Sequence, residues 1–288
     1  MHKTNSFLLW TLTVIITVSA MFYQRMTGPT YPKKVTVTLD GKEYNFGLLR
    51  SNEIGTPCDI NLEIEDPDVE ATIFFKRFKV DEPWEEVKMK RKTSHKKAFF
   101  GEGDEIEVLF ATLPEQPSAG KVTYHIDLRK GEQKASIAAE DPVVLRFKGF
   151  VPRSVLIPHV LLMIIALFIG TRAGVEAIFG GDKTFKFVRL TLIAFGIGGL
   201  ILGPIVQKYA FGELWTGWPF GSDWTDNKTL FAWLFWVIAF FVLLKKPKNK
   251  IWPIIAMLVL FAMYMIPHSM GGSELNNETG KIETGVKD

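Results

Sequence analysis

Residues 207–229 have the sequence QKYAFGELWTGWPFGSDWTDNKT and lie between two long apolar runs of the chain. The segment combines three tryptophans with three glycines and with the polar residues Asp223, Asp226, Asn227 and Lys228. Indole rings favour the interface between lipid and water, and glycines permit tight turns. We therefore expect this segment, called the Trp-rich loop, to form a structured cap on one face of a membrane helix bundle.

Five apolar runs occur in the chain, at residues 7–23, 154–174, 187–206, 230–244 and 251–266. Their lengths approach the ~20 residues that a helix needs to cross about 30 Å of hydrocarbon. The sequence therefore predicts an N-terminal helix and a four-helix transmembrane bundle. The first run fits either a membrane anchor or a signal peptide, because residues 18–20 resemble a cleavage site. Trp10 and Tyr23 at its two ends favour the anchor.

Basic residues predict how these spans are oriented. Lysines and arginines gather in the connectors around residues 172–189 and 245–250, whereas the Trp-rich loop contains only Lys208 and Lys228. Positively charged connectors stay on the cytoplasmic side of a membrane. We therefore expect the Trp-rich loop, the region before the bundle and the C-terminus to be extracytoplasmic.

The region between the first and second apolar runs has the pattern of a β-domain. Residues 34–39, 59–65, 105–110 and 121–127 alternate apolar with polar side chains, and turn signals such as Asp40-Gly41 separate them. Many short strands at this spacing predict an immunoglobulin- or fibronectin-like β-sandwich.

The predicted fold class is therefore an α+β membrane protein, with an N-terminal anchor helix, a β-sandwich and then a four-helix transmembrane bundle. The expected domains are residues 1–30 (transmembrane anchor or signal peptide), 31–151 (extracytoplasmic β-sandwich), 152–268 (four-helix transmembrane domain) and 269–288 (extracytoplasmic tail).

The composition and charge of the chain exclude several kinds of partner and site. The chain has 288 residues, a formal net charge of +3 and a single cysteine, Cys58. So small a charge, without a nucleic-acid motif, excludes nucleic acid as an expected partner. One cysteine excludes an intrachain disulfide and a cysteine-based metal cluster. The basic run at residues 88–97 fits either a contact with anionic lipid or an acidic partner, or a solvated hairpin; nearby acidic stretches favour the hairpin.

A candidate site lies on the predicted outer face. His159 and His268 each end an Ile-Pro-His tripeptide, one at the start of a span and the other at the end of a span. Two histidines with carboxylates nearby are suitable ligands for zinc or copper, and two histidines alone can ligate haem. The alternative is that these histidines only satisfy helix ends. The full candidate set is His159, His268, Asp223, Asp226, Glu274, Trp215 and Trp218.

Enzyme motifs give little support to catalysis. The residues from Gly180 to Thr184 lack the spacing of a phosphate-binding loop, and no nucleophile elbow or metalloprotease motif occurs. Away from the predicted interfaces the spans contain no charged residue, which disfavours a transporter. Arg172 and Glu176 lie four residues apart near one span end, and we interpret them as a structural pair.

Three segments carry a resemblance, namely residues 144–172, 202–229 and 266–274, which include WTGWPFGSDWTDNKT and IPHSMGGSE. They resemble a family of uncharacterised bacterial inner-membrane proteins with an extracytoplasmic β-domain and a four-helix membrane bundle. The resemblance implies this architecture and a bacterial envelope location, and it implies no activity.

The expected role is therefore a non-catalytic accessory, assembly or binding component of the bacterial cell envelope. The expected partners are the lipid bilayer and another envelope protein. The alternative role is metal or haem handling at the outer face through His159 and His268.

Overall fold

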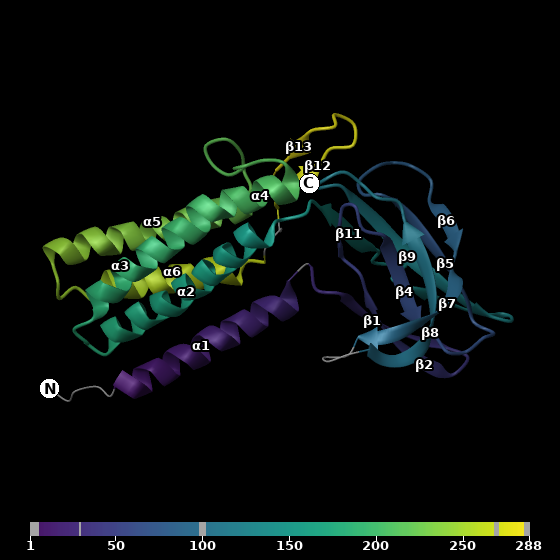
Figure 1. Ribbon diagram of the computed structural model, residues 1–288, viewed down its shortest axis with the longest axis horizontal. Helices are drawn as coiled ribbons and strands as arrows, with labels where there is room; N and C mark the ends of the chain where they lie inside the picture. Colours follow the sequence, from purple (N-terminus) through teal and green to yellow (C-terminus); the bar gives the residue numbers. More distant parts are fainter. Residues whose placement is uncertain (1–5, 29, 98–101, 268–270, 285–288) are drawn as a thin grey trace. The chain divides into compact units, whose positions relative to one another are not determined.

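The computed structural model describes residues 6–28, 30–97, 102–267 and 271–284. The chain is α+β, with an N-terminal apolar helix, a β-rich region and several further apolar helices (Figure 1). It divides into two compact units. The helical unit takes in the described residues of Met1–Pro29, Phe150–Ser273 and Glu283–Asp288, and the β unit those of Thr30–Gly149 and Glu274–Ile282.

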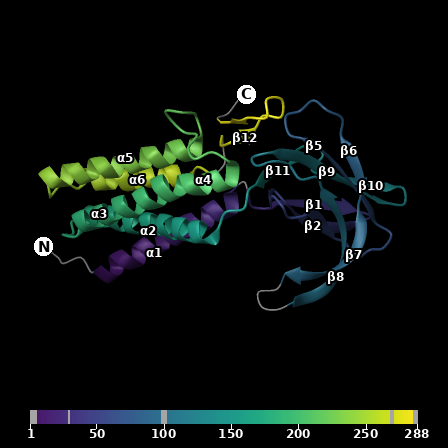
Figure 2. The ribbon, with the colours of Figure 1, turned by 45° about the horizontal axis from the view of Figure 1, so that its top comes forward.

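The helical unit contains the elements α1 (Ser6–Thr27), α2 (Arg153–Ile178), α3 (Thr184–Phe195), the π-helix η1 (Gly196–Leu202), α4 (Gly203–Phe211), α5 (Trp224–Lys245) and α6 (Ile251–Met265). Figure 2 shows these helices side by side in one bundle. Among the described residues, four helices are long and apolar enough to cross a membrane: α1, α2, the continuous helix Thr184–Phe211, and α5. The fifth expected span, α6, has 15 residues. At 1.5 Å per residue it extends only about 22 Å, less than the hydrocarbon thickness.

Gly199 in the π-helix η1 and Gly203 at the start of α4 face different neighbouring helices. Gly199 and Gly203 are four residues apart, so an α-helix would place both on one face. In the structure a Cβ atom at Gly199 would lie 2.8 Å from Cγ2 of Thr229 in α5, whereas Gly203 faces His159 in α2. The close approach of Thr229 explains why a small residue occurs at Gly199.

The β unit contains eleven strands before α2 among its described residues: β1 (Lys33–Leu39), β2 (Lys42–Leu48), β3 (Ser51–Glu53), β4 (Cys58–Glu63), β5 (Glu70–Arg77), β6 (Glu85–Lys88), β7 (Lys90–Lys97), β8 (Glu102–Leu113), β9 (Lys121–Lys130), β10 (Gln133–Ile137) and β11 (Val143–Lys148). Strands β1 and β2 form a hairpin. A larger sheet has the order β3-β11-β9-β5-β6, with β10 also paired to β9. A third sheet has the order β4-β8-β7.

One hydrophobic core joins the sheets of the β unit. Alternate residues of the strands face it, as in β4, where Cys58, Ile60 and Leu62 are buried. Strands β5, β8, β9 and β11 contribute in the same way. The predicted alternation of the strands is therefore confirmed. The hairpin turn at Asp40 and Gly41 has positive φ at both residues, 53° and 72°, and Asp-Gly is a sequence suited to that geometry.

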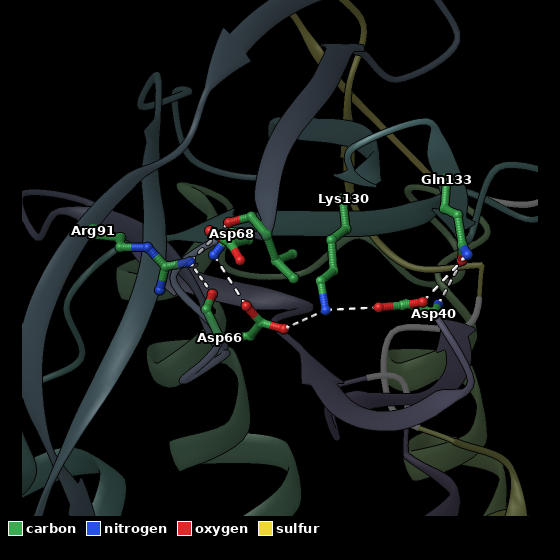
Figure 3. Close-up of polar contacts among 7 residues, drawn as sticks. Asp40, Asp66, Asp68, Arg91, Lys130 and Gln133 are labelled. Atoms are coloured by element: carbon green, nitrogen blue, oxygen red, sulfur yellow. Dashed lines mark hydrogen bonds and ion pairs between the residues drawn. The ribbon is translucent and has the colours of Figure 1, made fainter.

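A polar network ties the turns of the β unit together (Figure 3). The ammonium of Lys130 lies 2.7 Å from a carboxylate oxygen of Asp40 and 3.0 Å from one of Asp66. Gln133 exchanges hydrogen bonds with Asp40, and the guanidinium of Arg91 donates to the main-chain carbonyl of Asp66. These bonds join the β1–β2 turn, the turn before β5, strand β7 and the β9–β10 hairpin.

This network also accounts for part of the basic run at residues 88–97. Arg91 donates to the carbonyls of Ile64 and Val69 as well as that of Asp66. Lys88 pairs with Glu70, and Lys92 pairs with Asp59. Three basic side chains of the run are therefore engaged within the β unit.

The chain passes between the two units four times. Residues 28–32 separate α1 from β1, and residues 149–152 separate β11 from α2. After α6 the chain returns to the β unit, where β12 (Glu274–Leu275) pairs with β13 (Ile282–Glu283). Within that unit the main-chain N–H of Leu275 donates to the carbonyl of Ala119 at 3.1 Å. Part of the expected C-terminal tail is therefore integrated into the β unit.

Candidate functional site

The middle of the Trp-rich loop is fastened to the first turn of α5. One carboxylate oxygen of Asp226 accepts hydrogen bonds from the main-chain N–H groups of Thr216 and Gly217, at 2.7 and 3.0 Å. The side-chain oxygen of Asn227 accepts the N–H of Trp218 at 2.6 Å. Three consecutive backbone donors are thus satisfied by two neighbouring side chains. The non-helical part of the loop is a folded cap on the end of α5.

Asp223 connects this cap to its surroundings. One of its oxygens accepts the N–H of Thr225 at 2.8 Å, which caps the N-terminus of α5. The other oxygen lies 3.1 Å from the hydroxyl of Thr216 and 3.3 Å from that of Ser273. Gln207 in α4 donates to the same Thr216 hydroxyl at 2.6 Å. The cluster therefore joins α4, the loop, α5 and the segment after α6.

Two of the three carboxylates of the candidate set, those of Asp223 and Asp226, are brought together by this cluster. The Thr216 hydroxyl lies within 3.3 Å of both Asp223 and Asp226. Their side chains are buried, with 3% and 5% of each residue exposed. Burial without partners would be costly, and the donors from Thr216, Gly217, Thr225 and Ser273 offset that cost. The arrangement fixes the loop firmly.

The tryptophans of the loop are half-buried, as is Trp215, or exposed, as are Trp218 and Trp224. The indole N–H of Trp215 donates to the carbonyl of Trp218 at 3.0 Å, which closes the loop on itself. Trp218 is 68% exposed, Phe220 is 83% exposed, and Trp224 is 45% exposed. Large exposed rings beside span-length helices are typical of the headgroup region of a membrane.

An apolar groove of about 540 Å³ lies beside the cap, between the first turns of α5 and the end of α6. Its lining includes Trp218, Trp224, Phe231, Leu234, Met263 and Ile266. Lys228 lines the same groove, and its ammonium donates to the carbonyl of Ile266 at 2.6 Å. That carbonyl belongs to the C-cap of α6, where helix carbonyls lack partners and cations are favoured.

His159 lies in α2 against the π-helix. Its Nδ1 is 2.8 Å from the carbonyl oxygen of Gly198. Because a carbonyl only accepts, Nδ1 carries a proton, and in the neutral imidazole Nε2 then holds the lone pair. The second histidine of the predicted pair, His268, lies outside the described residues. The structure therefore places one imidazole of the predicted metal or haem site, and the shared site stays a prediction.

Glu274 belongs to the β unit, where it forms ion pairs with Lys121 and Lys79. Burial alone would raise the pKa of this carboxyl group. The hydrogen bond and charge of Lys121, assisted by Lys79, outweigh burial and lower the pKa of Glu274. Burial lowers the pKa of Lys121 in turn, with a further contribution from Arg146. Glu274 thus fastens the tail, whereas Asp223 and Asp226 lie in the helical unit.

Within the part of the chain that the structure describes, no three histidine, cysteine, aspartate or glutamate side chains are grouped so as to hold a metal ion.

The buried position of Arg172 and Glu176 was missed by sequence reasoning. The two side chains form an ion pair within α2 and are only 1% and 6% exposed. The guanidinium carbon of Arg172 lies 5.0 Å from the ring centre of Trp10 and 4.9 Å from that of Phe187. Glu176 accepts the N–H of Lys183 at 3.1 Å. The sequence showed the i,i+4 pair, but not the aromatic rings that enclose it.

An aromatic cluster on the β unit was also missed. The ring of His125 in β9 stacks on Phe74 of β5 at 5.0 Å and meets Trp84 edge-on at 4.6 Å. The ammonium of Lys76 lies 5.2 Å from the Trp84 ring, which is 37% exposed. The Nδ1 atom of His125 is buried and has no hydrogen-bond partner among the residues that the structure describes. Burial lowers the pKa of this imidazole.

Comparison of the chain with protein-family models, with curated proteins and with solved structures finds no match.

Proposed function

We propose that this protein is a non-catalytic accessory, assembly or binding component of the bacterial cell envelope. In this proposal the helical unit lies in the inner membrane, and the β unit is an immunoglobulin- or fibronectin-like sandwich outside the cytoplasm. The C-terminus is also extracytoplasmic. Basic residues in the connectors after α2 and α5 support this orientation through the positive-inside rule.

The observation that carries the proposal is the double attachment of the β unit. Span-length helices precede and follow it, through the five residues 28–32 and the four residues 149–152. Linkers this short restrict how far a domain can move from the membrane. A third attachment follows α6, where Glu274 is fastened by Lys121. Such a β unit is suited to hold a partner near the membrane surface.

The cluster of Phe74, His125 and Trp84 is the part of the β unit best suited to that contact. Aromatic side chains are enriched at protein interfaces, where they bury much area at little entropic cost. The Trp84 ring is partly exposed, so a partner that covers it would remove apolar surface from water. Lys76 beside it supplies a positive charge at the rim.

Photo-crosslinking in intact cells tests this function. A photoreactive amino acid is placed at Trp84 and, as a control, at the exposed Lys134 of β10, in the full-length protein. We expect a discrete crosslink to one other envelope protein at Trp84 and none at Lys134. Equal, diffuse labelling at both positions, or no product at either, would contradict a binding role for this face.

One observation favours the alternative of metal or haem handling. The hydrogen bond from Nδ1 of His159 to Gly198 favours the tautomer in which Nε2 can bind a metal ion or haem iron. The test is the absorption spectrum and metal content of the purified protein. Stoichiometric haem or metal, lost in both His159→Ala and His268→Ala, would support this alternative over the accessory role.

A further inference from the structure

We propose that the groove between α5 and α6 binds one acyl chain of an anionic phospholipid, whose phosphate lies at Lys228. The inference is independent of the partner of the β unit. It rests on the shape of the groove, on the charge at its end and on the aromatic rings beside it.

The groove is suited to a chain of methylene groups. Phe231, Leu234 and Met263 line it with apolar side chains, and its volume is about 540 Å³. Its lining residues along α5 extend from Trp224 to Leu234. Ten residues of α-helix span about 15 Å, so the groove follows a substantial part of one leaflet. Phe231 and Leu234 are 47% and 43% exposed, so the groove is open to an occupant.

Lys228 supplies the charge that selects an anionic headgroup. Lys228 is 92% buried, and its ammonium donates to the carbonyl of Ile266. An ammonium has three donors, and a phosphate oxygen is a strong acceptor for a second one. Asp223 and Asp226 are the nearby carboxylates, and their oxygens already accept from Thr216 and its neighbours. Lys228 is therefore the group in this lining that an anion would contact.

The indoles of Trp218 and Trp224 place this charge at the depth of a headgroup. Both line the groove and both are exposed, at 68% and 45%. Tryptophan collects at the level where acyl chains meet headgroups. A lipid with its phosphate at Lys228 and its acyl chain along Leu234 would match its charge to the ammonium and its methylene groups to the apolar lining. The apolar face of a helix from another protein carries no anion to match the cation at the end of the groove.

Native mass spectrometry of the purified full-length protein tests the proposal, with dioleoylphosphatidylglycerol and dioleoylphosphatidylcholine as probes. We expect one phosphatidylglycerol to be retained per chain, at least tenfold more tightly than phosphatidylcholine. Lys228→Met should remove that preference, and Lys228→Arg should keep it. Lys208→Met is the matched control, because Lys208 also donates to a carbonyl past a helix end, that of Gly212, but is exposed and does not line the groove.

A second variant keeps the test decisive if Lys228→Met does not fold. Leu234→Trp adds bulk at a partly exposed position of the groove, so it should fold normally and weaken retention of both lipids at least tenfold. Competition by inorganic phosphate would assign the site to the free anion and would overturn the acyl-chain part. The proposal would be overturned if Leu234→Trp retained lipid as well as the wild type does. It would also be overturned if a second copy of this chain or another protein occupied the groove in place of lipid.

Discussion

The guanidinium carbon of Arg172 in α2 lies 5.0 Å from the ring centre of Trp10 in α1. The Trp10 ring also stacks on Phe168 of α2, at 5.3 Å, and meets Phe187 of α3 edge-on, at 5.7 Å. Farther along α1, Gln24 donates to the carbonyl of Tyr264 in α6 at 2.8 Å. Contacts along the length of α1 thus tie it to the rest of the helical unit.

We therefore expect α1 to remain in the mature protein as an anchor. Cleavage after Ala20 would remove Trp10, together with the buried Leu9, Thr13 and Thr17. The intact mass of the protein purified from membranes should include residues 1–20. Trp10→Ala should lower thermal stability and Trp10→Phe much less, because the phenyl ring keeps part of the cation–π contact. A mature N-terminus near residue 21 would contradict this prediction.

The ion pair of Arg172 and Glu176 gives a second prediction, about stability. Removing one member of a buried pair leaves an unpaired charge and costs about 3–5 kcal/mol. Arg172→Met and Glu176→Gln should therefore each destabilise the protein strongly. The double variant Arg172→Met/Glu176→Gln leaves no charge behind and should recover much of the loss. Thermal unfolding in detergent measures this cycle. If the double variant lost as much stability as the two single variants together, the two side chains would not act as a pair.

The Trp-rich loop gives a third prediction. Asp226→Ala leaves the buried N–H groups of Thr216 and Gly217 without an acceptor, at a cost of about 1–3 kcal/mol each. We expect the wild-type loop to resist protease and the variant to be cut between residues 211 and 226. Glu213→Ala is the control, because Glu213 is exposed in the same loop. Equal cutting rates in wild type and Asp226→Ala would show that the carboxylate does not hold the loop.

The Asp226 contacts also show where sequence reasoning fell short. The apolar run at residues 230–244 was expected to begin a helix at residue 230, whereas α5 begins at Trp224. Asp223 caps the helix and the polar residues after it form its first turn, so hydropathy alone places the start too late. The π-helix was not predictable either, because glycine spacing is equally compatible with an α-helix. Strand alternation and the Asp40–Gly41 turn were predictable because both are local.

Only part of the candidate site could be predicted from the sequence. The cluster of polar residues in the Trp-rich loop correctly indicated an ordered segment, since Asp223 and Asp226 meet at Thr216. Nothing local indicated that Glu274 would pair with Lys121, which lies 153 positions earlier in the chain. The rings around Arg172 come from α1 and α3, and such tertiary contacts leave no pattern in one segment.

Cys58 gives a prediction about pH. Burial, with a smaller contribution from the Asp59 carboxylate, raises the pKa of the Cys58 thiol from 9.0 to about 12. The unfolded chain loses the thiol proton at lower pH than the folded chain does. The thiol's contribution to stability is therefore complete below pH 9.0 and is lost as pH rises from 9.0 toward 12. The slope is at most about 1.4 kcal/mol per pH unit.

Two measurements check this. Thermal stability should fall between pH 9 and pH 11 in the wild type and fall less in Cys58→Ala. At pH 8 the folded protein should react with a thiol reagent far more slowly than the denatured protein, because Cys58 is 2% exposed. Rapid labelling of the folded protein would mean that this strand opens readily.

The orientation of the helical unit gives the last prediction. Basic residues after α5 should keep the α5–α6 connector in the cytoplasm, and the Trp-rich loop should then face outward. Cysteine reporters are placed at Ser222 and Lys248, both exposed, in a Cys58→Ala background. The neighbouring Asn249 is avoided because its side chain accepts the N–H of Trp252 at the start of α6. An impermeant thiol reagent should label Ser222→Cys in intact cells, and Lys248→Cys only after the membrane is opened. Labelling of Lys248→Cys in intact cells would show that the orientation is the opposite one. The β unit and the lipid groove would then not lie on the outer side.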